Sequence, residues 1–336
     1  MLRIVLENPG RFVTADVPVP TQAPGDALVR VHRIGVCGTD LHAFAGRQPF
    51  FNYPRVLGHE LGVEVVDPGS EPQGLKPGDR CSVEPYLNCG RCIACRRGKS
   101  NCCTSLSVLG VHVDGGMQPL LTVPAAKLHR SERLDFEALA MVEMLGIGAH
   151  AVERAEIQRG DFVLVIGAGP IGLSVIQFAR LADVTLAVMD VNEARLSACR
   201  EHLGVKHTLT PVDGAGRLNE IGGGDLPTIV FDASGNAKSM ATTFELAAHG
   251  GRIVFVGLFQ GDVTFSDPNF HRRELTLCAT RNALPSTFRE IIALMENGRI
   301  DPKSWITHRF PLAETPHKFS EVAHNPTLLK AMIAAD

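Results

Sequence analysis

Two rhythms of hydrophobic and polar positions divide the chain near residue 149. Before that point, short runs rich in Val, Leu and Ile are separated by Gly and Pro. These runs predict strands at residues 27–34, 62–66, 80–85 and 120–123. After it, apolar runs at residues 162–167, 185–190, 228–233, 252–257 and 275–279 alternate with helical patterns. The first rhythm is typical of an irregular β domain, and the second predicts a parallel sheet within an α/β domain.

The end of the chain combines both kinds of element. Residues 286–297 have the pattern of a helix, while residues 310–312 and 328–335 are interpreted as a return to the first domain. We therefore expect one domain from residues 1–148 with 281–336, and a second from residues 149–280. A length of 336 residues with 45% hydrophobic composition allows each domain to bury its own core.

The charge balance favours a small-molecule partner. The chain carries 33 basic and 36 acidic residues, a formal net charge of −3, with no basic tail, so a nucleic acid partner is not expected. The first residues lack the pattern of a signal peptide, and no apolar run has the length of a membrane span. We expect a cytoplasmic protein with no membrane partner.

The turn after the run at residues 162–167 has the residue types of a dinucleotide site. Gly167 permits a tight turn, Gly169 lets the backbone approach a pyrophosphate, and Gly172 allows a helix to pack closely on the strand. The turn opens an apolar helical stretch at residues 173–181 and reads Gly167-Ala168-Gly169-Pro170-Ile171-Gly172. Strand, glycine turn and helix in this order predict dinucleotide binding.

An acidic residue after the next strand indicates which dinucleotide is bound. Asp190 is placed to accept hydrogen bonds from both ribose hydroxyls and to repel a 2′-phosphate, which favours NAD over NADP. Arg195 follows about a turn later and is a candidate contact for such a phosphate. An arginine on an exposed helix is, however, more often a solvated charge.

Four closely spaced cysteines predict a metal site. They lie in a polar segment rich in Gly and Arg, and this spacing is much better explained by metal ligation than by unpaired buried thiols. Cys102 competes for the fourth place in the set Cys89, Cys92, Cys95 and Cys103. Four thiolates close the coordination sphere of zinc, so we expect a structural site whose loss unfolds the lobe and spares the chemistry.

A second set of possible ligands is dispersed along the chain, and spacing alone does not join its members. Cys37 follows a predicted strand, His59 and Glu60 follow Gly58, and Glu143 lies in a helical stretch. Taken separately, each is more often a core thiol, a hydrogen-bonded histidine or a surface charge than a ligand.

In this order, however, the motifs resemble the zinc-containing medium-chain alcohol dehydrogenase family, and particularly its sorbitol and polyol dehydrogenase branch. The resemblance covers essentially the whole chain and implies a GroES-like β-barrel catalytic domain plus a doubly wound Rossmann domain, with the chemistry in the cleft between them. Residues 46–60 and 256–259 are similar to dehydrogenases that act on L-galactonate at C5. The family motifs lie at residues 35–42, 58–60, 76–80, 89–103 and 167–172.

The resemblance implies that Cys37, His59 and Glu143 hold a catalytic zinc, with water or substrate as fourth ligand. Glu60 is then a neighbour or an alternate ligand, and Asp40 matches the acid that orients the zinc-bound histidine. A carboxylate in place of the second cysteine of simple alcohol dehydrogenases makes the ligand set harder, which suits a polyhydroxylated substrate.

The remaining roles also follow from the resemblance. Thr39 and His42 match the relay that carries the hydroxyl proton to solvent while hydride passes to NAD. Arg281 matches a position near the active site and is a candidate partner for a sugar acid, whereas Arg47 and Arg55 are looser candidates. Phe51 is a candidate substrate contact, with Phe50 and Tyr53 beside it.

Two departures from the family pattern concern the surroundings of the ligands. Val63 stands where the family usually has glycine, with Gly62 before it, and the stretch from Gly115 to Pro119 lacks the usual aromatic and acidic residues. Neither departure removes a ligand.

Other functions stay open at this point. They are an NAD-dependent dehydrogenase of another secondary alcohol such as L-threonine, a non-catalytic dinucleotide-binding protein, and an interaction protein built on the four-cysteine lobe. The resemblance also implies a homodimer or homotetramer, with sheet extension expected around residues 252–258 and 263–265.

Overall fold

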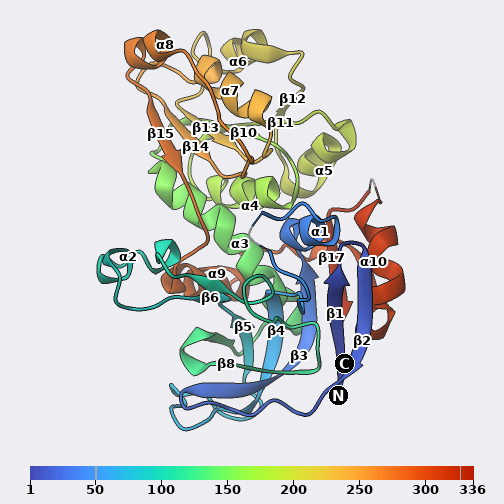
Figure 1. Cartoon of the computed structure of the whole chain (residues 1–336). Coiled ribbons are helices and arrows are strands. Elements are labelled where there is room, and N and C mark those ends of the chain that lie inside the picture. The colour runs from blue at the N-terminus through green and yellow to red at the C-terminus, as the bar shows by residue number, and fades with distance from the viewer. Residues whose placement is uncertain (50, 326) are drawn as a thin grey trace. The chain divides into compact units, whose positions relative to one another are not determined.

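The computed structural model describes residues 1–49, 51–325 and 327–336. It divides into two compact units, Met1–Met144 with Ala283–Asp336, and Leu145–Asn282. The first boundary falls within helix α3 (Phe136–Ala155), four residues before the predicted boundary at 148, and the second falls within two residues of the predicted boundary at 280. Figure 1 shows the elements of both units.

The first unit is built on a mixed, mainly antiparallel sheet. Strand β3 pairs with three neighbours, β17, β4 and β8, so it forms the centre of the sheet. Two smaller ribbons, β1 (Leu2–Asn8) with β2 (Arg11–Asp16) and β6 (Tyr86–Leu87) with β7 (Ser107–Val108), complete the β structure. The large sheet has the order β16 (Ile306–Pro311), β17 (Lys330–Ala334), β3 (Asp26–Val36), β4 (Glu60–Asp67), β5 (Arg80–Val83) and β9 (Leu128–Ser131), with β8 (Leu120–Pro124) on β3.

Buried apolar residues alternate with more exposed residues along the central strands, which explains why one face of this sheet is buried. On β3, Ala27, Val29 and Val31 are fully buried, while Arg30 between them is exposed. Because side chains of a strand point to opposite faces in turn, this pattern places the apolar set in one core. The short helices α1 (Gly38–Phe44), α9 (Pro285–Glu296) and α10 (Thr315–Ala323) belong to the same unit.

The second unit is a six-stranded parallel sheet with helices between its strands. Near-continuous apolar runs such as β10, buried at all five positions, are typical of strands covered on both faces. The order is β12 (His207–Leu209), β11 (Thr185–Met189), β10 (Phe162–Ile166), β13 (Ile229–Asp232), β14 (Arg252–Phe255) and β15 (Thr276–Ala279). This is the doubly wound order, in which ligands bind beyond the carboxyl ends of the strands where the order reverses.

The parallel sheet predicted from the strand and helix rhythm is confirmed. In the C-terminal segments, β16 and β17 join the large sheet of the first unit. The expected sheet extension around residues 252–258 is wrong. Strand β14 is paired on both sides, by β13 and β15, and the edge belongs to β15. No helix among the described residues is long and apolar enough to span a bilayer.

Candidate active site

The four-cysteine lobe forms between β6 and β7. One sulphur from each of Cys89, Cys92, Cys95 and Cys103 lies within 4.8 Å of the others. Zinc bound by four thiolates at 2.3 Å sets its sulphurs about 3.8 Å apart, so the group is close to the required size. Cys102, the alternative fourth ligand, is exposed and lies outside this group.

Backbone amides of the lobe favour the charged form of its sulphurs. The amide of Cys89 donates to Cys103 Sγ at 3.3 Å, and the amide of Cys95 donates to Cys92 Sγ at 3.5 Å. Hydrogen bonds from the backbone amides of Cys95 and Thr104 lower the pKa of Cys92 to about 5. A thiolate is the form that binds zinc, so the four sulphurs fit a structural zinc site.

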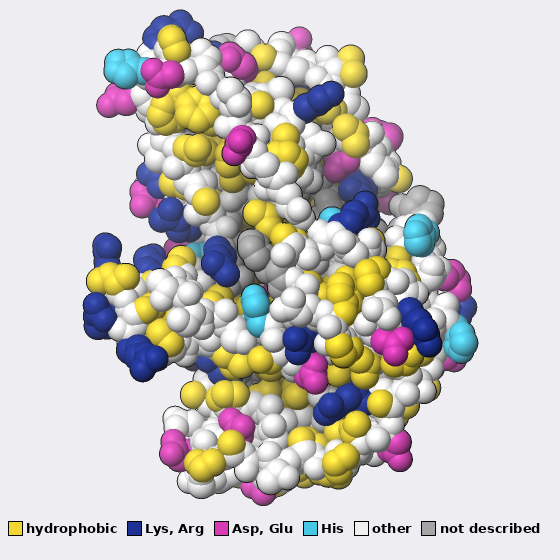
Figure 2. Space-filling view, viewed as in Figure 1, with side chains coloured by type: hydrophobic (Ala, Val, Ile, Leu, Met, Phe, Trp, Pro, Cys, Tyr) yellow, Lys and Arg dark blue, Asp and Glu magenta, His cyan; other side chains and the backbone are white. Residues whose placement is uncertain are grey.

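The surface of the lobe is basic. Helix α2 (Ile93–Arg96) lies in this lobe, and Figure 2 shows Lys and Arg side chains gathered over this part of the molecule. The exposed cations of the segment are Arg91, Arg96, Arg97 and Lys99.

A second group of possible metal ligands is buried in the first unit. Cys37, His59 and Glu60 each offer an atom within 4.8 Å of the others. Cys37 follows β3 and precedes α1, while His59 and Glu60 lie at the start of β4, and Gly35 of β3 is the register partner of Glu60. The antiparallel pairing of β3 with β4 therefore brings together residues that are more than 20 positions apart in the sequence.

Asp40 lies beside the histidine of this group. Its Oδ2 accepts a hydrogen bond from the Cys37 amide at 2.9 Å, and its Oδ1 lies 3.7 Å from His59 Nδ1. Burial lowers the pKa of His59, but the negative charges of Asp40, Cys37 and Glu143 outweigh it and raise that pKa well above its usual value. One ring nitrogen thus faces a carboxylate, the arrangement that leaves the other nitrogen for a metal.

The charges of this site fit a divalent cation. Asp40 and Glu60 are fully buried, Glu143 is 5% exposed, and burial raises the pKa of Asp40 and of Glu143. His59 Nδ1, Asp40 Oδ1 and Glu60 Oε1 are buried without a hydrogen-bond partner. Buried anionic groups that lack partners are costly unless a cation offsets them, and sulphur, nitrogen and carboxylate ligands together suit zinc.

Lys330 was not predicted from the sequence. It lies at the start of β17, is 2% exposed, and its ammonium forms an ion pair with Glu60 Oε2. Gly35 makes room for this pair, because a Cβ there would lie 2.0 Å from Glu60 Oε2. The signal that could have found Lys330 is a lysine that opens an otherwise apolar strand, since a buried ammonium needs a buried partner.

Glu143 lies on α3 and contacts a residue that the sequence reasoning also missed. Its Oε1 accepts a hydrogen bond from the hydroxyl of Tyr86, which is 2% exposed. Among the described residues, the compact ligand group contains Glu60 and not Glu143. The geometry thus favours Glu60, which the sequence predicted as the alternate ligand, and ligation by Glu143 stays a prediction.

The predicted proton relay lies on one short helix. Thr39 is half-buried and His42 is exposed, and both belong to α1. Burial lowers the pKa of His42, and the positive charge of Arg47 lowers it further. A histidine that is neutral at physiological pH can accept a proton, so the position is compatible with the predicted role.

The predicted substrate contacts are spread over both units. Phe51 is half-buried and packs edge-on against Tyr53, whose hydroxyl donates to the carbonyl of Ala43 in α1. Phe50 lies outside the described residues. Arg55 is ion-paired with Asp114 at 3.2 Å, which makes it a poor candidate for a substrate carboxylate. Arg281 belongs to the second unit, is exposed and follows β15, and its role stays a prediction.

The glycine turn of the second unit has the geometry that the sequence predicted. It joins β10 to α4 (Pro170–Ala179), and Gly167 has φ of +95°, a conformation that favours glycine. A Cβ at Gly172 would lie 1.7 Å from the carbonyl oxygen of Gly167, so a larger residue does not fit there. Pro170 and Ile171 begin α4, and the free backbone amides of a helix N-terminus can bind an anion, although Pro170 itself has no N–H to donate.

Asp190 organises this turn. It follows β11, is 6% exposed, and accepts hydrogen bonds from the amides of Ala168 at 2.6 Å and Asn192 at 2.8 Å. Arg195 NH1 lies 4.0 Å from Asp190 Oδ2 and 3.9 Å from the position of a Cβ on Gly169. Arg195 is thus more than a solvated charge, because its guanidinium lies beside the turn. Nucleotide contacts by Asp190 and Arg195 stay predictions.

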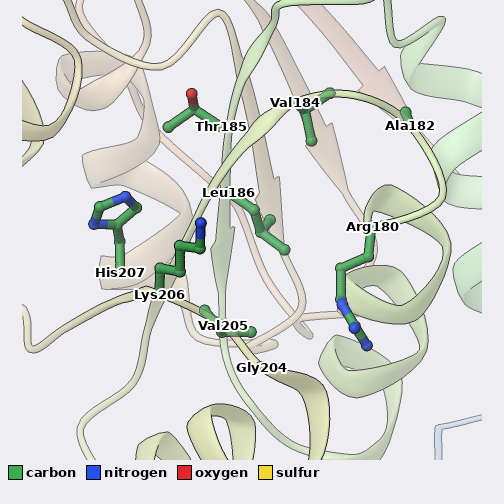
Figure 3. A pocket seen from close by; sticks show the side chains of 9 residues that line it. All are labelled: Arg180, Ala182, Val184, Thr185, Leu186, Gly204, Val205, Lys206 and His207. Carbon is green, nitrogen blue, oxygen red and sulfur yellow. The ribbon is translucent and has the colours of Figure 1, made fainter.

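A pocket of about 300 Å³ lies at the opposite end of this sheet (Figure 3). It is lined by Thr185 and His207, the first residues of β11 and β12, and by Arg180 and Lys206. The glycine turn follows the carboxyl end of β10, so this pocket is separate from the dinucleotide site in the same unit.

Comparison with known proteins assigns the family. Residues 23–133 match the model of the alcohol dehydrogenase GroES-like domain, and residues 170–297 match that of the zinc-binding dehydrogenase. The L-galactonate-5-dehydrogenase of Escherichia coli is 40% identical over 336 residues, which is 98% of each chain. This chain belongs to the zinc-type alcohol dehydrogenase family. It is an oxidoreductase, and the predicted GroES-like and Rossmann folds are confirmed.

Other dehydrogenases match along their whole length. The D-altritol 5-dehydrogenase of Agrobacterium fabrum is 32% identical, over 97% of each chain. A solved alcohol dehydrogenase from Escherichia coli, complexed with NADH, has a TM-score of 0.92 and 29% identity, covering 100% of this chain and 99% of that one. A zinc-binding dehydrogenase from Sinorhizobium meliloti, bound to NADP, has a TM-score of 0.90 and 29% identity, covering 99% of both chains.

The departures from the family pattern have a packing reason. A Cβ at Gly62 would lie 2.0 Å from the carbonyl oxygen of Phe136, so the glycine lets β4 approach the start of α3, while Val63 is fully buried. Gly115 and Gly116 lie against the backbone of Gly58 and the side chain of Leu61. Both departures therefore concern the support of the segment that carries His59 and Glu60.

Proposed function

We propose that this dehydrogenase oxidises a secondary hydroxyl of a polyol or sugar acid with NAD, and that L-galactonate, oxidised at C5, is the first substrate to test. The observation that carries the reaction class is the buried group of Cys37, His59 and Glu60 with an excess of negative charge around it. The buried ammonium of Lys330 offsets one of the carboxylates, and a bound cation would offset the remaining negative charge; the family is one of zinc-binding dehydrogenases.

The named activities of the relatives support the substrate class. The L-galactonate and D-altritol enzymes both bear the name of a 5-dehydrogenase, and both match this chain over nearly its whole length. Their names refer to oxidation at C5 of a polyhydroxylated carbon chain. Carboxylates near Cys37 and His59 agree with such a substrate, because a harder ligand set tolerates more oxygen atoms around the metal.

Cys37, His59 and a carboxylate of Glu60 or Glu143 would hold the zinc. When bound, zinc supplies a Lewis acid for the substrate hydroxyl, and NAD supplies the acceptor of the hydride. Asp40, whose Oδ1 lies 3.7 Å from His59 Nδ1, would orient the ring toward the metal. Thr39 and His42 are three positions apart on α1 and so lie on one face of the helix, from which the exposed His42 passes the proton to solvent.

The choice of NAD rests on Asp190. Its buried carboxylate is held by two backbone amides beside the glycine turn, where the adenosine ribose binds in this fold. Arg195 is paired with the same carboxylate and is therefore partly neutralised as a partner for a 2′-phosphate. Relatives of the fold occur with NADH and with NADP, so the cofactor must be measured for this chain.

The test is the formation of NADH at 340 nm by purified, zinc-replete protein with L-galactonate, D-altritol, sorbitol or L-threonine. NADP replaces NAD as a control, and C37S serves as a variant that loses a ligand with little change in size. We expect turnover of a polyol or aldonate with NAD that C37S lacks. Preference for L-threonine, or silence across the panel with zinc and NAD both bound, would contradict the substrate class.

A further inference from the structure

Tyr86 connects the four-cysteine lobe with the buried carboxylates of the candidate active site. It is one of two tyrosines in the chain, and its hydroxyl donates to Glu143 Oε1. Both side chains are almost completely buried, so water cannot take the place of the phenol. Because one of its two oxygens is held by the phenol, the carboxylate of Glu143 has a fixed orientation.

The ring of Tyr86 is fixed as firmly as its hydroxyl. It packs edge-on against Phe288 of α9 with ring centres 6.2 Å apart, and Phe288 is fully buried. His129 of β9 also stacks on Phe288, with ring centres 5.0 Å apart, and its Nε2 lies 3.1 Å from Glu84 Oε2. The position of the phenol is therefore set by packing and not by the hydrogen bond alone.

The backbone of Tyr86 belongs to the stem of the four-cysteine lobe. Strands β6 and β7 pair antiparallel, with Tyr86 opposite Val108, and the four cysteines lie in the segment between these strands. Tyr86 is only three residues before Cys89. A shift of the backbone that carries the four cysteines would therefore move Tyr86, because only Leu87 of strand β6 and Asn88 separate it from Cys89.

A chain of polar contacts makes a second connection. Asn88 Nδ2 donates to Cys95 Sγ at 3.7 Å, and Asn88 Oδ1 accepts from Lys127 Nζ at 2.9 Å. The same ammonium donates to Glu84, which is 1% exposed and lies two residues before Tyr86. The network is part-buried at Asn88 and Lys127 and buried at Glu84, and members of such a network are coupled through their shared hydrogen bonds.

We infer that Tyr86 is a positioning residue that orients Glu143 beside the Cys37 and His59 ligand group, and that the four-cysteine lobe holds Tyr86 in place through Asn88. The inference rests on the proposed metal site and deepens it. It replaces the expectation that damage to the lobe spares the chemistry. The lobe is then a support for the active site as well as a local structural element.

The test uses Y86F, which removes the hydroxyl and keeps the ring against Phe288. Zinc held at Cys37 and His59 is removed with dipicolinate and replaced by cobalt, and the visible bands that are missing in C37S identify this site. We expect Y86F to shift these bands, to weaken zinc binding in a chelator competition by about 10-fold or more, and to lower kcat with an unchanged KM for NAD.

Y53F is the matched control, because it removes the other phenolic hydroxyl of the chain, which donates to the Ala43 carbonyl. Only its cobalt bands and zinc affinity are compared, because Tyr53 packs against the candidate substrate contact Phe51, and both are expected to match those of the wild type. Circular dichroism verifies that each variant is folded. Unchanged cobalt bands and zinc affinity in Y86F overturn the inference, whereas a wild-type protein without Cys37-dependent bands overturns the proposed metal site itself.

The role of the lobe is tested with N88A and the double variant Y86F/N88A. If Asn88 acts through Tyr86, N88A weakens zinc binding at Cys37 and His59 in the wild type and has little further effect in the Y86F background. If N88A reduces zinc affinity equally in the wild-type and Y86F backgrounds, or does not reduce it in the wild type, the connection to the lobe is overturned.

Discussion

At the scale of single residues, charges close to a titratable group shift its pKa. His42 shows this most simply, because partial desolvation of its ring and the positive charge of Arg47 both lower its pKa. A lowered pKa keeps the imidazole neutral over more of the physiological range, which a proton acceptor requires. If His42 is the proton acceptor that we propose, we expect Arg47 to act on it through its charge, without contact with substrate.

Substitution of Arg47 tests this electrostatic role. In the oxidation direction, activity is present above the pKa of His42 and is lost as the pH falls through it. Removing the nearby positive charge in R47A raises that pKa, so the acid limb of kcat/KM moves to higher pH. A pH profile of kcat/KM measures the shift, with H42A as the reference that lacks this limb and loses on the order of 10²-fold in kcat. A profile of R47A that coincides with the wild type contradicts the assignment.

Gly35 illustrates a residue whose importance is invisible without the register of the strands. Its missing side chain makes room for the carboxylate of Glu60, since a Cβ would lie 2.0 Å from Oε2. The sequence shows only a glycine within an apolar strand. Its need arises because β4 pairs with β3 so that Glu60 lies opposite Gly35, and no local pattern reports such a pairing.

We predict that G35A lowers the free energy of unfolding by about 1–3 kcal/mol, because the new methyl group displaces a buried carboxylate from its ion pair with Lys330. Urea denaturation measures the loss. The control is G38A, since a Cβ at Gly38 on α1 meets nothing within 4 Å and alanine is the better helix former. If G35A and the wild type are equally stable, the Glu60 side chain can adopt another position at no cost in free energy, and the prediction is contradicted.

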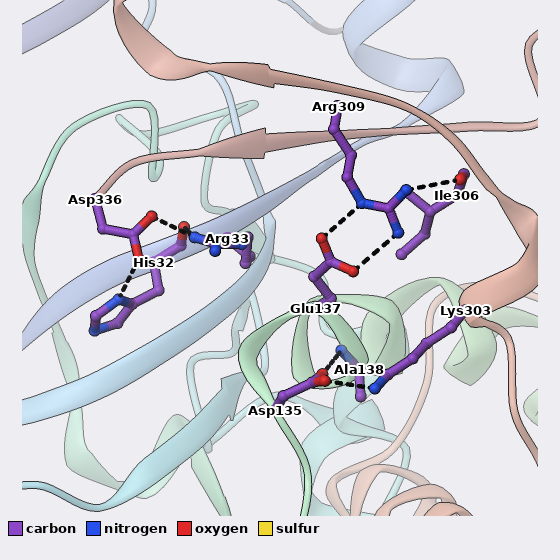
Figure 4. Close-up of polar contacts among 9 residues, drawn as sticks. All are labelled: His32, Arg33, Asp135, Glu137, Ala138, Lys303, Ile306, Arg309 and Asp336. Carbon is purple, nitrogen blue, oxygen red and sulfur yellow. Dashed lines mark hydrogen bonds and ion pairs between the residues drawn. The ribbon is translucent and has the colours of Figure 1, made fainter.

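At the scale of elements, the strands and helices of the second unit were predictable and the ion pairs that anchor α3 were not. Apolar runs such as residues 162–167 report a buried strand directly, because burial on both faces removes polar residues from it. The short strand β12 escaped prediction, as three residues carry too little periodicity. Figure 4 shows the ion pairs at the start of α3, which join segments more than 160 residues apart.

One of these pairs joins Arg309 of β16 to Glu137. Two parallel bonds, Nε to Oε1 at 2.8 Å and NH2 to Oε2 at 3.0 Å, give it the bidentate geometry (Figure 4). The hydrogen bond from Arg309 lowers the pKa of Glu137. A carboxyl with a lowered folded pKa stabilises the fold above its unfolded pKa, and this contribution is lost as the pH falls through the folded value.

R309M is therefore expected to cost up to about 1 kcal/mol at neutral pH, since Arg309 is half exposed and solvent screens the pair. The difference from wild type should shrink as the pH falls through the folded pKa of Glu137. Thermal unfolding at a series of pH values checks both statements. R159M, which removes an ion pair whose two side chains are 87% and 76% exposed, serves as the control with a difference near zero. A pH-independent difference would point to lost packing instead.

At the scale of the whole molecule, the chemistry is divided between the two units. All candidate metal ligands belong to the first, and the glycine turn with Asp190 belongs to the second. The four-cysteine lobe and the glycine turn could be read from local spacing. The ligands Cys37, His59 and Glu60 could be joined only through the family resemblance, because β3 and β4 bring them together in space. Tyr86 and Lys330 lie outside every local motif, and the structure alone connects them to the site.

Eight of the nine cysteines report on this organisation in both units. Cys81 in the first unit and Cys199 in the second are buried, and burial raises the pKa of each thiol to about 12, so both should be inert in the folded protein. Cys102 is exposed and should react with a thiol reagent even when zinc is bound. Removal of zinc should release the thiols of the two ligand groups, Cys37, Cys89, Cys92, Cys95 and Cys103.

Mass-spectrometric mapping of alkylated peptides, before and after treatment with a strong chelator, distinguishes these classes. We expect Cys102 to be modified first, the five ligand thiols only after chelation, and Cys81 with Cys199 only in denaturant. Protection of the lobe cysteines that persists after complete zinc removal would mean that the lobe is held by its hydrogen bonds without metal. Alkylation of Cys37 in zinc-replete protein at the rate of Cys102 would instead remove it from the ligand set, and with it the basis of the proposed catalytic site.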